Sequence, residues 1–156
     1  MTVFADSSAL VKLYVAEAHH EAIRAIAEPI IISALAEVEV PAALWRKHRI
    51  GEISGADAGI LSAEFAADVD GEGLAMPRFA VVAVGSAVVA GATGLVARHP
   101  LRGFDAVQLA TALAARQTLG RLGGFVAFDV VLRSAAAAEG LALVPETFAD
   151  DPIGRR

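Results

Sequence analysis

Residues 3–17, VFADSSALVKLYVAE, join an apolar run to an amphipathic pattern and place one carboxylate at the junction. Residues 3–5 predict a short buried strand. The residues that follow predict a helix, capped by Ser7 or Ser8, with leucines and a tyrosine on its apolar side. Burying a carboxylate costs free energy unless the group is paired. Asp6, at the end of a buried strand, is therefore a candidate functional residue.

The same strand-then-helix pattern recurs along the chain. Further strands are expected at residues 30–32, 80–84, 125–128 and 141–144. Helices are expected at residues 9–18, 21–27, 34–47, 56–65, 86–97, 106–119 and 130–139. Strands that alternate with helices favour right-handed crossovers and a mainly parallel sheet. The sequence thus predicts an α/β fold, with helices flanking a central sheet, in one domain of residues 1–150 followed by a short tail of residues 151–156.

The amino-acid composition narrows the cellular compartments and the kinds of binding partner to be expected for the protein. The chain of 156 residues has no cysteine, which excludes disulfides and thiolate metal sites and is compatible with the cytoplasm. Its net charge of −5 argues against a broadly basic nucleic-acid-binding surface but leaves room for a local basic patch. Residues 79–97 carry no charge, yet they include six alanines and three glycines. We expect a buried strand and a tightly packed helix there, and neither a membrane span nor a signal peptide.

Acidic residues stand where a parallel sheet forms its binding sites. In open α/β sheets these sites lie outside the carboxyl ends of the strands. Asp6 directly follows the strand at residues 3–5, and Asp129 directly follows the strand at residues 125–128. Asp105 opens a helix, where a carboxylate is also favoured by the helix dipole alone.

Two glutamates compete for a fourth position on the helix expected at residues 34–47. Glu37 and Glu39 are two residues apart, or about 200° around a helix, so they cannot both face one pocket. An apolar stripe is expected to face the core, with Glu39 at its edge and Glu37 toward solvent; it comprises Leu35, Val38, Ala42 and Trp45.

The four acids come from separate elements, and this suggests a cation site. Carboxylates that converge raise each other's pKa unless a cation neutralises them. A set of oxygen ligands without cysteine or clustered histidine suits Mg²⁺ or Mn²⁺ better than Zn²⁺. We therefore expect a divalent cation bound by Asp6, Glu39, Asp105 and Asp129.

Four stretches in order resemble the motifs of the PIN-domain ribonucleases, specifically the VapC-type toxins of toxin–antitoxin pairs. They are DSSALVKLYVAE, SALAEVEVPAALWRK, LRGFDAVQLATAL and FVAFDVVLRSAAAAEGL. The resemblance implies a PIN-like fold in which Asp6, Glu39, Asp105 and Asp129 are catalytic metal ligands, with Ser7 as a supporting hydroxyl. It further implies an Mg²⁺- or Mn²⁺-dependent endoribonuclease that leaves 5′-phosphate and 3′-hydroxyl ends, and a homodimer held inactive by a small cognate antitoxin.

One departure from the family pattern keeps a second function open. The family usually has Ser or Thr two residues before the last aspartate, where this chain has Ala127. The alternative is a catalytically weak or inactive PIN-like domain that only binds RNA or a partner.

Basic residues gather in two short clusters that are candidates for RNA contact. WRKHR spans residues 45–49, and ARHPLR spans residues 97–102. An acidic pocket needs nearby cations to attract RNA. Arg102, three residues before Asp105, is the best candidate, followed by Arg46, Lys47, Arg98 and Arg49; the alternative is that they are solvated cations at helix ends. Trp45 is expected in the core, and base stacking is its alternative role.

Overall fold

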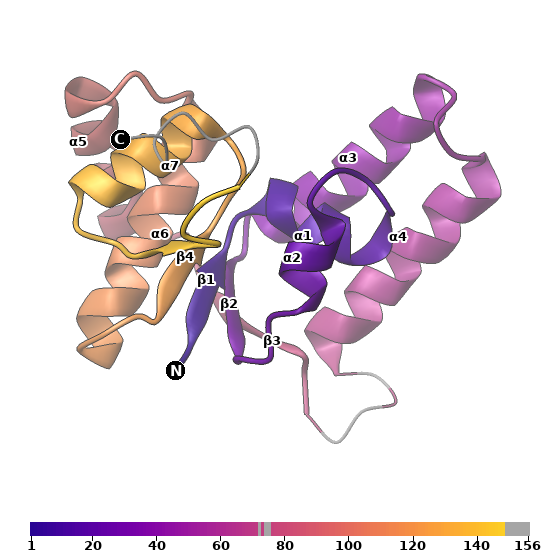
Figure 1. The fold of residues 1–156 in the computed structure, drawn as a ribbon, viewed down its shortest axis with the longest axis horizontal. Helices are drawn as coiled ribbons and strands as arrows, with labels where there is room; N and C mark the ends of the chain where they lie inside the picture. The colour runs from indigo at the N-terminus through magenta and orange to yellow at the C-terminus, as the bar shows by residue number, and fades with distance from the viewer. Residues whose placement is uncertain (72, 74–75, 149–156) are drawn as a thin grey trace.

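The computed structural model describes residues 1–71, 73 and 76–148, and it contains a parallel sheet at its centre (Figure 1). The strands are β1 (Val3–Ala5), β2 (Ile30–Ser33), β3 (Phe79–Val82), β4 (Gly124–Val126) and β5 (Leu143–Val144). Their order is β3-β2-β1-β4-β5, and every recorded pairing is parallel. The α/β fold is therefore as predicted. The expected tail at residues 151–156 lies outside the described residues.

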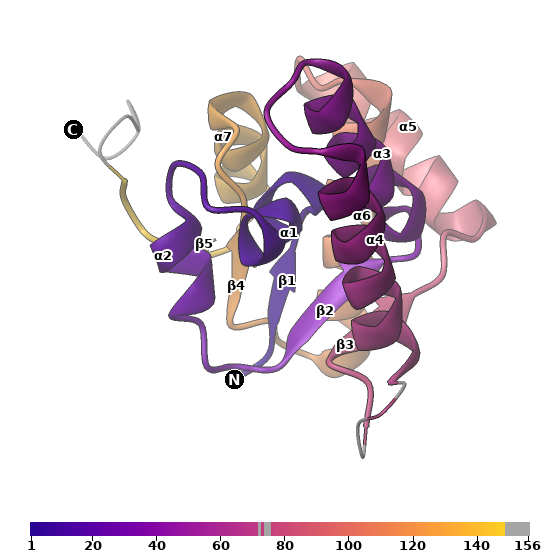
Figure 2. The same cartoon turned by 90° about the vertical axis from the view of Figure 1, so that its right-hand side faces the viewer.

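Helices cover both faces of the sheet. One face carries α1 (Ser7–Tyr14), α2 (His20–Arg24), α3 (Ala36–Arg49) and α4 (Gly55–Asp70). The other carries α5 (Ser86–Arg98), α6 (Gly103–Leu119) and α7 (Val130–Ala138). Figures 1 and 2 show the sheet between these two groups. The uncharged segment at residues 79–97 forms β3 and most of α5. The expected buried strand is wrong, because β3 lies at the edge of the sheet and exposes Ala80 and Val81. None of the described helices is long and apolar enough to cross a membrane.

Two cores form because side chains alternate along each strand. Phe4 of β1 packs with the α5–α7 side, while its neighbours Val3 and Ala5 pack with the α1–α4 side. The rings of Phe4 and Phe125 stack with centroids 5.7 Å apart, which joins β1 to β4 within the first core. All three residues of β1 are buried, as a central strand requires.

The order of the strands fixes where a site can form. From β1 the chain builds outward through β2 to β3, and then crosses to the other side of β1 to add β4 and β5. In such sheets a crevice opens at the carboxyl ends of two adjacent strands whose following connections run to opposite sides. Here those strands are β1 and β4, which end next to Asp6 and Asp129.

Candidate active site

One cavity of about 600 Å³ brings together all four acids singled out in the sequence. Asp6 and Asp129 follow β1 and β4, Glu39 lies in the first turn of α3, and Asp105 lies in the first turn of α6. The remaining lining residues are Ser7, Ser8, Ala43, Arg102, Gly103, Phe104 and Gln108. Residues far apart in the chain thus share a single acidic cavity.

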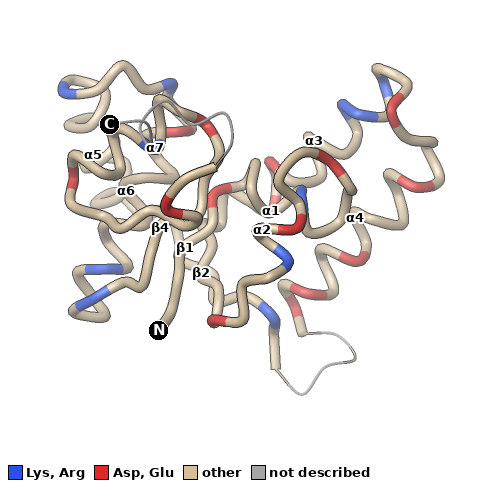
Figure 3. Tube along the Cα trace, viewed as in Figure 1, with Lys and Arg blue, Asp and Glu red and all other residues tan. Residues whose placement is uncertain are grey.

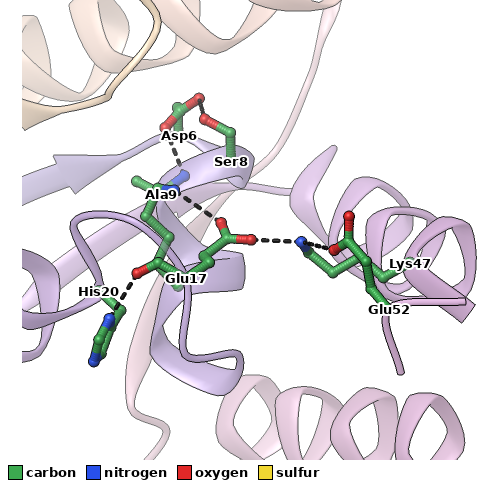
Figure 4. Close-up of polar contacts among 8 residues, drawn as sticks. Asp6, Ser8, Ala9, Glu17, His20, Lys47 and Glu52 are labelled. Carbon is green, nitrogen blue, oxygen red and sulfur yellow. Dashed lines mark hydrogen bonds and ion pairs between the residues drawn. The ribbon is translucent and has the colours of Figure 1, made fainter. Parts of the chain in front are cut away.

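Asp6 is the most buried of these acids, with 4% of its surface exposed. It is itself the N-cap of α1, so the expectation that Ser7 or Ser8 caps this helix was wrong. One carboxylate oxygen accepts from the Ala9 backbone N–H at 3.0 Å, and the other accepts from the Ser8 hydroxyl at 2.7 Å (Figure 4). Burial raises the pKa of Asp6 to about 6, hydrogen bonds from Ser8 and Ala9 oppose that rise, and the charge of Asp105 adds a little to it.

Glu39 is held by a hydrogen-bonded triangle. The Ser7 hydroxyl donates to its Oε2 at 2.7 Å, and the Gln108 amide donates to the same oxygen at 2.6 Å. Gln108 also donates to the Ser7 hydroxyl at 2.6 Å. Gln108 was missed in the sequence, although its position three residues after Asp105 places both on one side of α6.

The direction of Glu39 was predicted correctly on partly wrong grounds. The buried residues of α3 are Ala36, Val40 and Leu44, whereas Val38 and Trp45 are exposed. The predicted stripe and the core position of Trp45 are therefore wrong. Glu39 still faces the cavity, because it borders the face of α3 that is actually buried, and Glu37 is exposed as expected.

Asp105 and Asp129 each have one local partner. The Arg102 guanidinium donates to Asp105 at 2.9 Å, and this ion pair is the first cause of a raised pKa of Arg102. The charges of Asp129 and Glu39 raise that pKa further, so Arg102 lies within the field of three of the acids. Asp129 caps α7 by accepting from the Leu132 backbone N–H at 2.8 Å.

The other predicted cations lie elsewhere. Lys47 pairs with Glu17 at 2.5 Å and with Glu52 at 2.8 Å, so two carboxylates already surround it (Figure 4). Arg98 pairs with Glu139 at 3.0 Å and does not line the acidic cavity. Arg46 lines a neighbouring cavity near the far end of α3, where basic residues cluster (Figure 3).

The chemistry of the donors fits a hard divalent cation. The cavity offers carboxylate and amide oxygens, and the Oε1 atom of Gln108 is buried without a hydrogen-bond donor among the described residues. The raised pKa of Asp6 reflects an unneutralised carboxylate in a poorly solvated position, which a cation would relieve. As the side chains stand, no three acidic or histidine residues of the described chain are arranged to hold one ion, and each of the four carboxylates is hydrogen-bonded to a neighbour.

Comparison with known proteins adds the family. A model of the PIN domain family matches residues 3–138. A toxin–antitoxin complex from Klebsiella pneumoniae contains a chain of similar fold, with a TM-score of 0.54 and 17% identity, over 82% of this chain and 87% of that one. The crystal structure of Mycobacterium tuberculosis VapC20, described as a Sarcin-Ricin loop cleaving toxin, has a TM-score of 0.60 and 20% identity, over 93% of this chain and 98% of that one. No curated protein matches the chain.

Proposed function

Because the chain belongs to the PIN domain family, we propose that it is a metal-dependent endoribonuclease that acts as the toxin of a toxin–antitoxin pair. The reaction is hydrolysis of an RNA phosphodiester bond, with Mg²⁺ or Mn²⁺ as the cofactor. Similarity in fold to a chain of a toxin–antitoxin complex and to a toxin described as cleaving the Sarcin-Ricin loop supports this proposal.

The main support for the proposal is that four carboxylates meet in one cavity at the carboxyl ends of β1 and β4, where the order of the strands reverses. Four separate elements supply them, and Asp6 is buried at a cost that folding alone does not require. A carboxylate with a raised pKa in a cavity, as Asp6 is, is typical of catalytic sites.

Each residue has a role that follows from its contacts. Asp6, Glu39, Asp105 and Asp129 would hold the cation, which when bound supplies the positive charge that activates water and stabilises a phosphoryl transition state. Ser7 and Gln108 fix the direction of Glu39 through their hydrogen bonds. Arg102 is exposed at the rim, where exchange of its Asp105 partner for a phosphate oxygen would orient the RNA backbone.

The proposal is tested by incubating the purified protein with single-stranded and structured RNA in Mg²⁺ or Mn²⁺. We expect cleavage that EDTA abolishes and that Asp105→Ala and Glu39→Ala reduce at least a hundredfold. Glu37→Ala is the matched control, because Glu37 is an exposed acid on the same helix, and it should cleave like the wild type. Cleavage that persists in EDTA would contradict the proposal.

The products and the metal give two further readouts. The cut should leave 5′-phosphate and 3′-hydroxyl ends, and a 2′,3′-cyclic phosphate would overturn the hydrolytic mechanism. Calorimetric titration with Mn²⁺ should show binding to the wild type that Asp6→Ala weakens at least tenfold. Equal binding by the two proteins would remove Asp6 from the ligand set.

A second candidate function is RNA or partner binding without cleavage. Ala127, buried two residues before Asp129, favours it because the hydroxyl usual at that position in the family is missing. In that case the protein would bind RNA but show no metal-dependent cleavage in the assay above.

The proposed activity implies partners. A ribonuclease toxin must be restrained, so we propose a small cognate antitoxin as its partner, a homodimer as its assembly and the cytoplasm as its place of action. Light scattering of the purified protein tests the dimer: a mass near 32 kDa is expected, twice the 16.0 kDa chain, and a monomer mass would contradict it.

A further inference from the structure

Phe104 is an aromatic residue in an unusual place. It lies in the first turn of α6, next to Asp105, and 63% of its surface is exposed. Among the described phenylalanines only Phe104 is exposed, and its ring lies beside the acidic cavity. Phe104 also lines a second cavity of about 500 Å³, so it stands where the two cavities meet.

The second cavity follows one side of α3. Glu39, Ala43, Arg46 and Arg49 lie on successive turns of that helix and therefore form a row. The row begins at the acid shared with the first cavity and passes the small alanine side chains. It reaches Arg46 about 10 Å from Glu39 along the helix axis. Its far end is basic, as the charges along α3 in Figure 3 show.

Some of the charged side chains that line this second cavity, called the groove below, form ion pairs and others do not. Lys47 and Glu52, which also line it, pair with one another at 2.8 Å. Arg46 and Arg49 are exposed, and neither guanidinium makes an ion pair or hydrogen bond within the part of the chain that the structure describes. Two cations that have no side-chain partner among the described residues therefore lie along a groove that ends at an exposed aromatic ring.

From this arrangement we propose that the groove between Phe104 and the far end of α3 binds a single-stranded RNA segment next to the acidic cavity. Phe104 stacks on a base, Ala42 and Ala43 leave room for it, and Arg46 and Arg49 contact the backbone phosphates. An aromatic platform within a cationic groove is how proteins hold single strands, and duplex RNA keeps its bases stacked away from such a ring. The inference rests on the proposed function only for its substrate class, since binding can be measured without cleavage.

The test is fluorescence anisotropy with a fluorescein-labelled, single-stranded RNA of twelve nucleotides, in EDTA so that metal-dependent cleavage does not occur. Stacking on one base is worth about 1–3 kcal/mol, or about 5- to 150-fold in affinity. We therefore expect Phe104→Leu to weaken binding at least fivefold, whereas Phe104→Trp retains the wild-type affinity within twofold. Because the ring is exposed, both variants should melt like the wild type.

The salt dependence of RNA binding distinguishes the contribution of the two arginines from that of the Phe104 ring. Each phosphate contact on a single strand contributes about 0.7 to the slope of log K against log salt. Replacing Arg46 and Arg49 together with Gln should reduce that slope by about 1.4, and Phe104→Leu should leave it unchanged. The matched control replaces Arg24 and Arg121, exposed arginines outside both cavities, and it should preserve the wild-type slope.

The outcomes distinguish this inference from the proposed function. Two results would overturn the proposed groove: an RNA affinity of Phe104→Leu equal to that of the wild type, or a salt slope of the Arg46 and Arg49 variant equal to that of its control. Either result would assign the exposed ring to a protein partner. If instead Phe104→Leu loses RNA affinity while the wild type cuts no RNA in Mn²⁺, the nuclease proposal fails and the RNA groove stands.

Discussion

Asp6 makes the metal-free protein sensitive to pH. Burial raises its pKa to about 6 in the folded state, while the unfolded value is 3.8. Between these values the folded state binds more protons than the unfolded state, so the free energy of unfolding falls as the pH rises through this window. A shift of about two units corresponds to a loss of about 3 kcal/mol by pH 7.5. Asp6→Asn, which keeps the capping oxygen, should avoid that loss.

Urea unfolding in EDTA measures this effect. Asp6→Asn should exceed the wild type by about 3 kcal/mol at pH 7.5 and by much less at pH 4. Asp57→Asn, at the start of α4 and away from the cavity, serves as the control. An equal difference between Asp6→Asn and the wild type at both pH values would show that burial of the charge is not the cause.

Gln108 offers a second prediction, because its amide lies 2.6 Å from the Glu39 carboxylate. Gln108→Glu replaces the donor with another carboxylate, so both hydrogen bonds are lost and like charges meet. We expect a loss of about 2 kcal/mol or more at pH 7.5, and Gln108→Met should lose less because it adds no charge. Gln117→Glu, an exposed position on the same helix, should change stability by less than about 0.5 kcal/mol. Equal losses in Gln108→Glu and Gln108→Met would contradict the charge argument.

The acids could be predicted from sequence at this scale, but their hydrogen bonds could not. Asp6 and Asp129 follow apolar runs that are short enough to be strands, so their position at the edge of the sheet is a local signal. The triangle that holds Glu39 joins residues that are 32 and 69 positions apart from it in the chain. No spacing rule within one element reports such a contact. The role of Gln108 therefore appeared only once α3 and α6 were placed beside each other.

At the scale of elements, two of the acids also determine where helices begin. Asp6 caps α1, and Asp129 caps α7. Capping orients each carboxylate at the helix N-terminus and fixes it beside the end of the preceding strand. The same side chain therefore serves as a helix cap and, under the proposed function, as a metal ligand.

The two roles of Asp129 can be separated by substitution. Asp129→Ala loses the cap and should lower the free energy of unfolding by about 1 kcal/mol, whereas Asp129→Asn keeps an oxygen for the Leu132 N–H and should lower it by a few tenths. Both variants should lose RNA cleavage if the carboxylate binds metal. Urea unfolding and the cleavage assay together provide the test, and full activity in Asp129→Asn would leave Asp129 with only the capping role.

Helix α3 shows why element faces are harder to predict than elements. The sequence favoured a buried stripe of Leu35, Val38, Ala42 and Trp45, but burial follows Ala36, Val40 and Leu44. Both sets of residues recur at helical spacing, so spacing alone does not choose between them, and the packing of α3 against α1 and α4 decides which face is buried. Glu39 was assigned to the correct side because it borders both the predicted and the actual buried faces.

At the scale of the whole molecule, the sheet couples two cores into one cooperative unit. β1, β2 and β4 each place side chains in both cores, so neither core keeps its packing if these strands separate. Leu44 is fully buried on the α1–α4 side and Leu109 on the α5–α7 side. Truncating either to Ala should lower the free energy of unfolding by about 3 kcal/mol, the usual cost of a cavity.

The single tryptophan makes that coupling measurable. Trp45 lies on α3, on the opposite side of the sheet from Leu109. If the molecule unfolds as one unit, Leu109→Ala should shift the Trp45 fluorescence transition and the far-ultraviolet circular dichroism transition to the same lower urea concentration. Leu44→Ala, next to Trp45 in the chain, provides the comparison in which both signals must move. A fluorescence midpoint that stays at the wild-type value in Leu109→Ala would mean that the α1–α4 side unfolds independently. In that case Asp6 and Glu39 would belong to a different cooperative unit from Asp105 and Asp129.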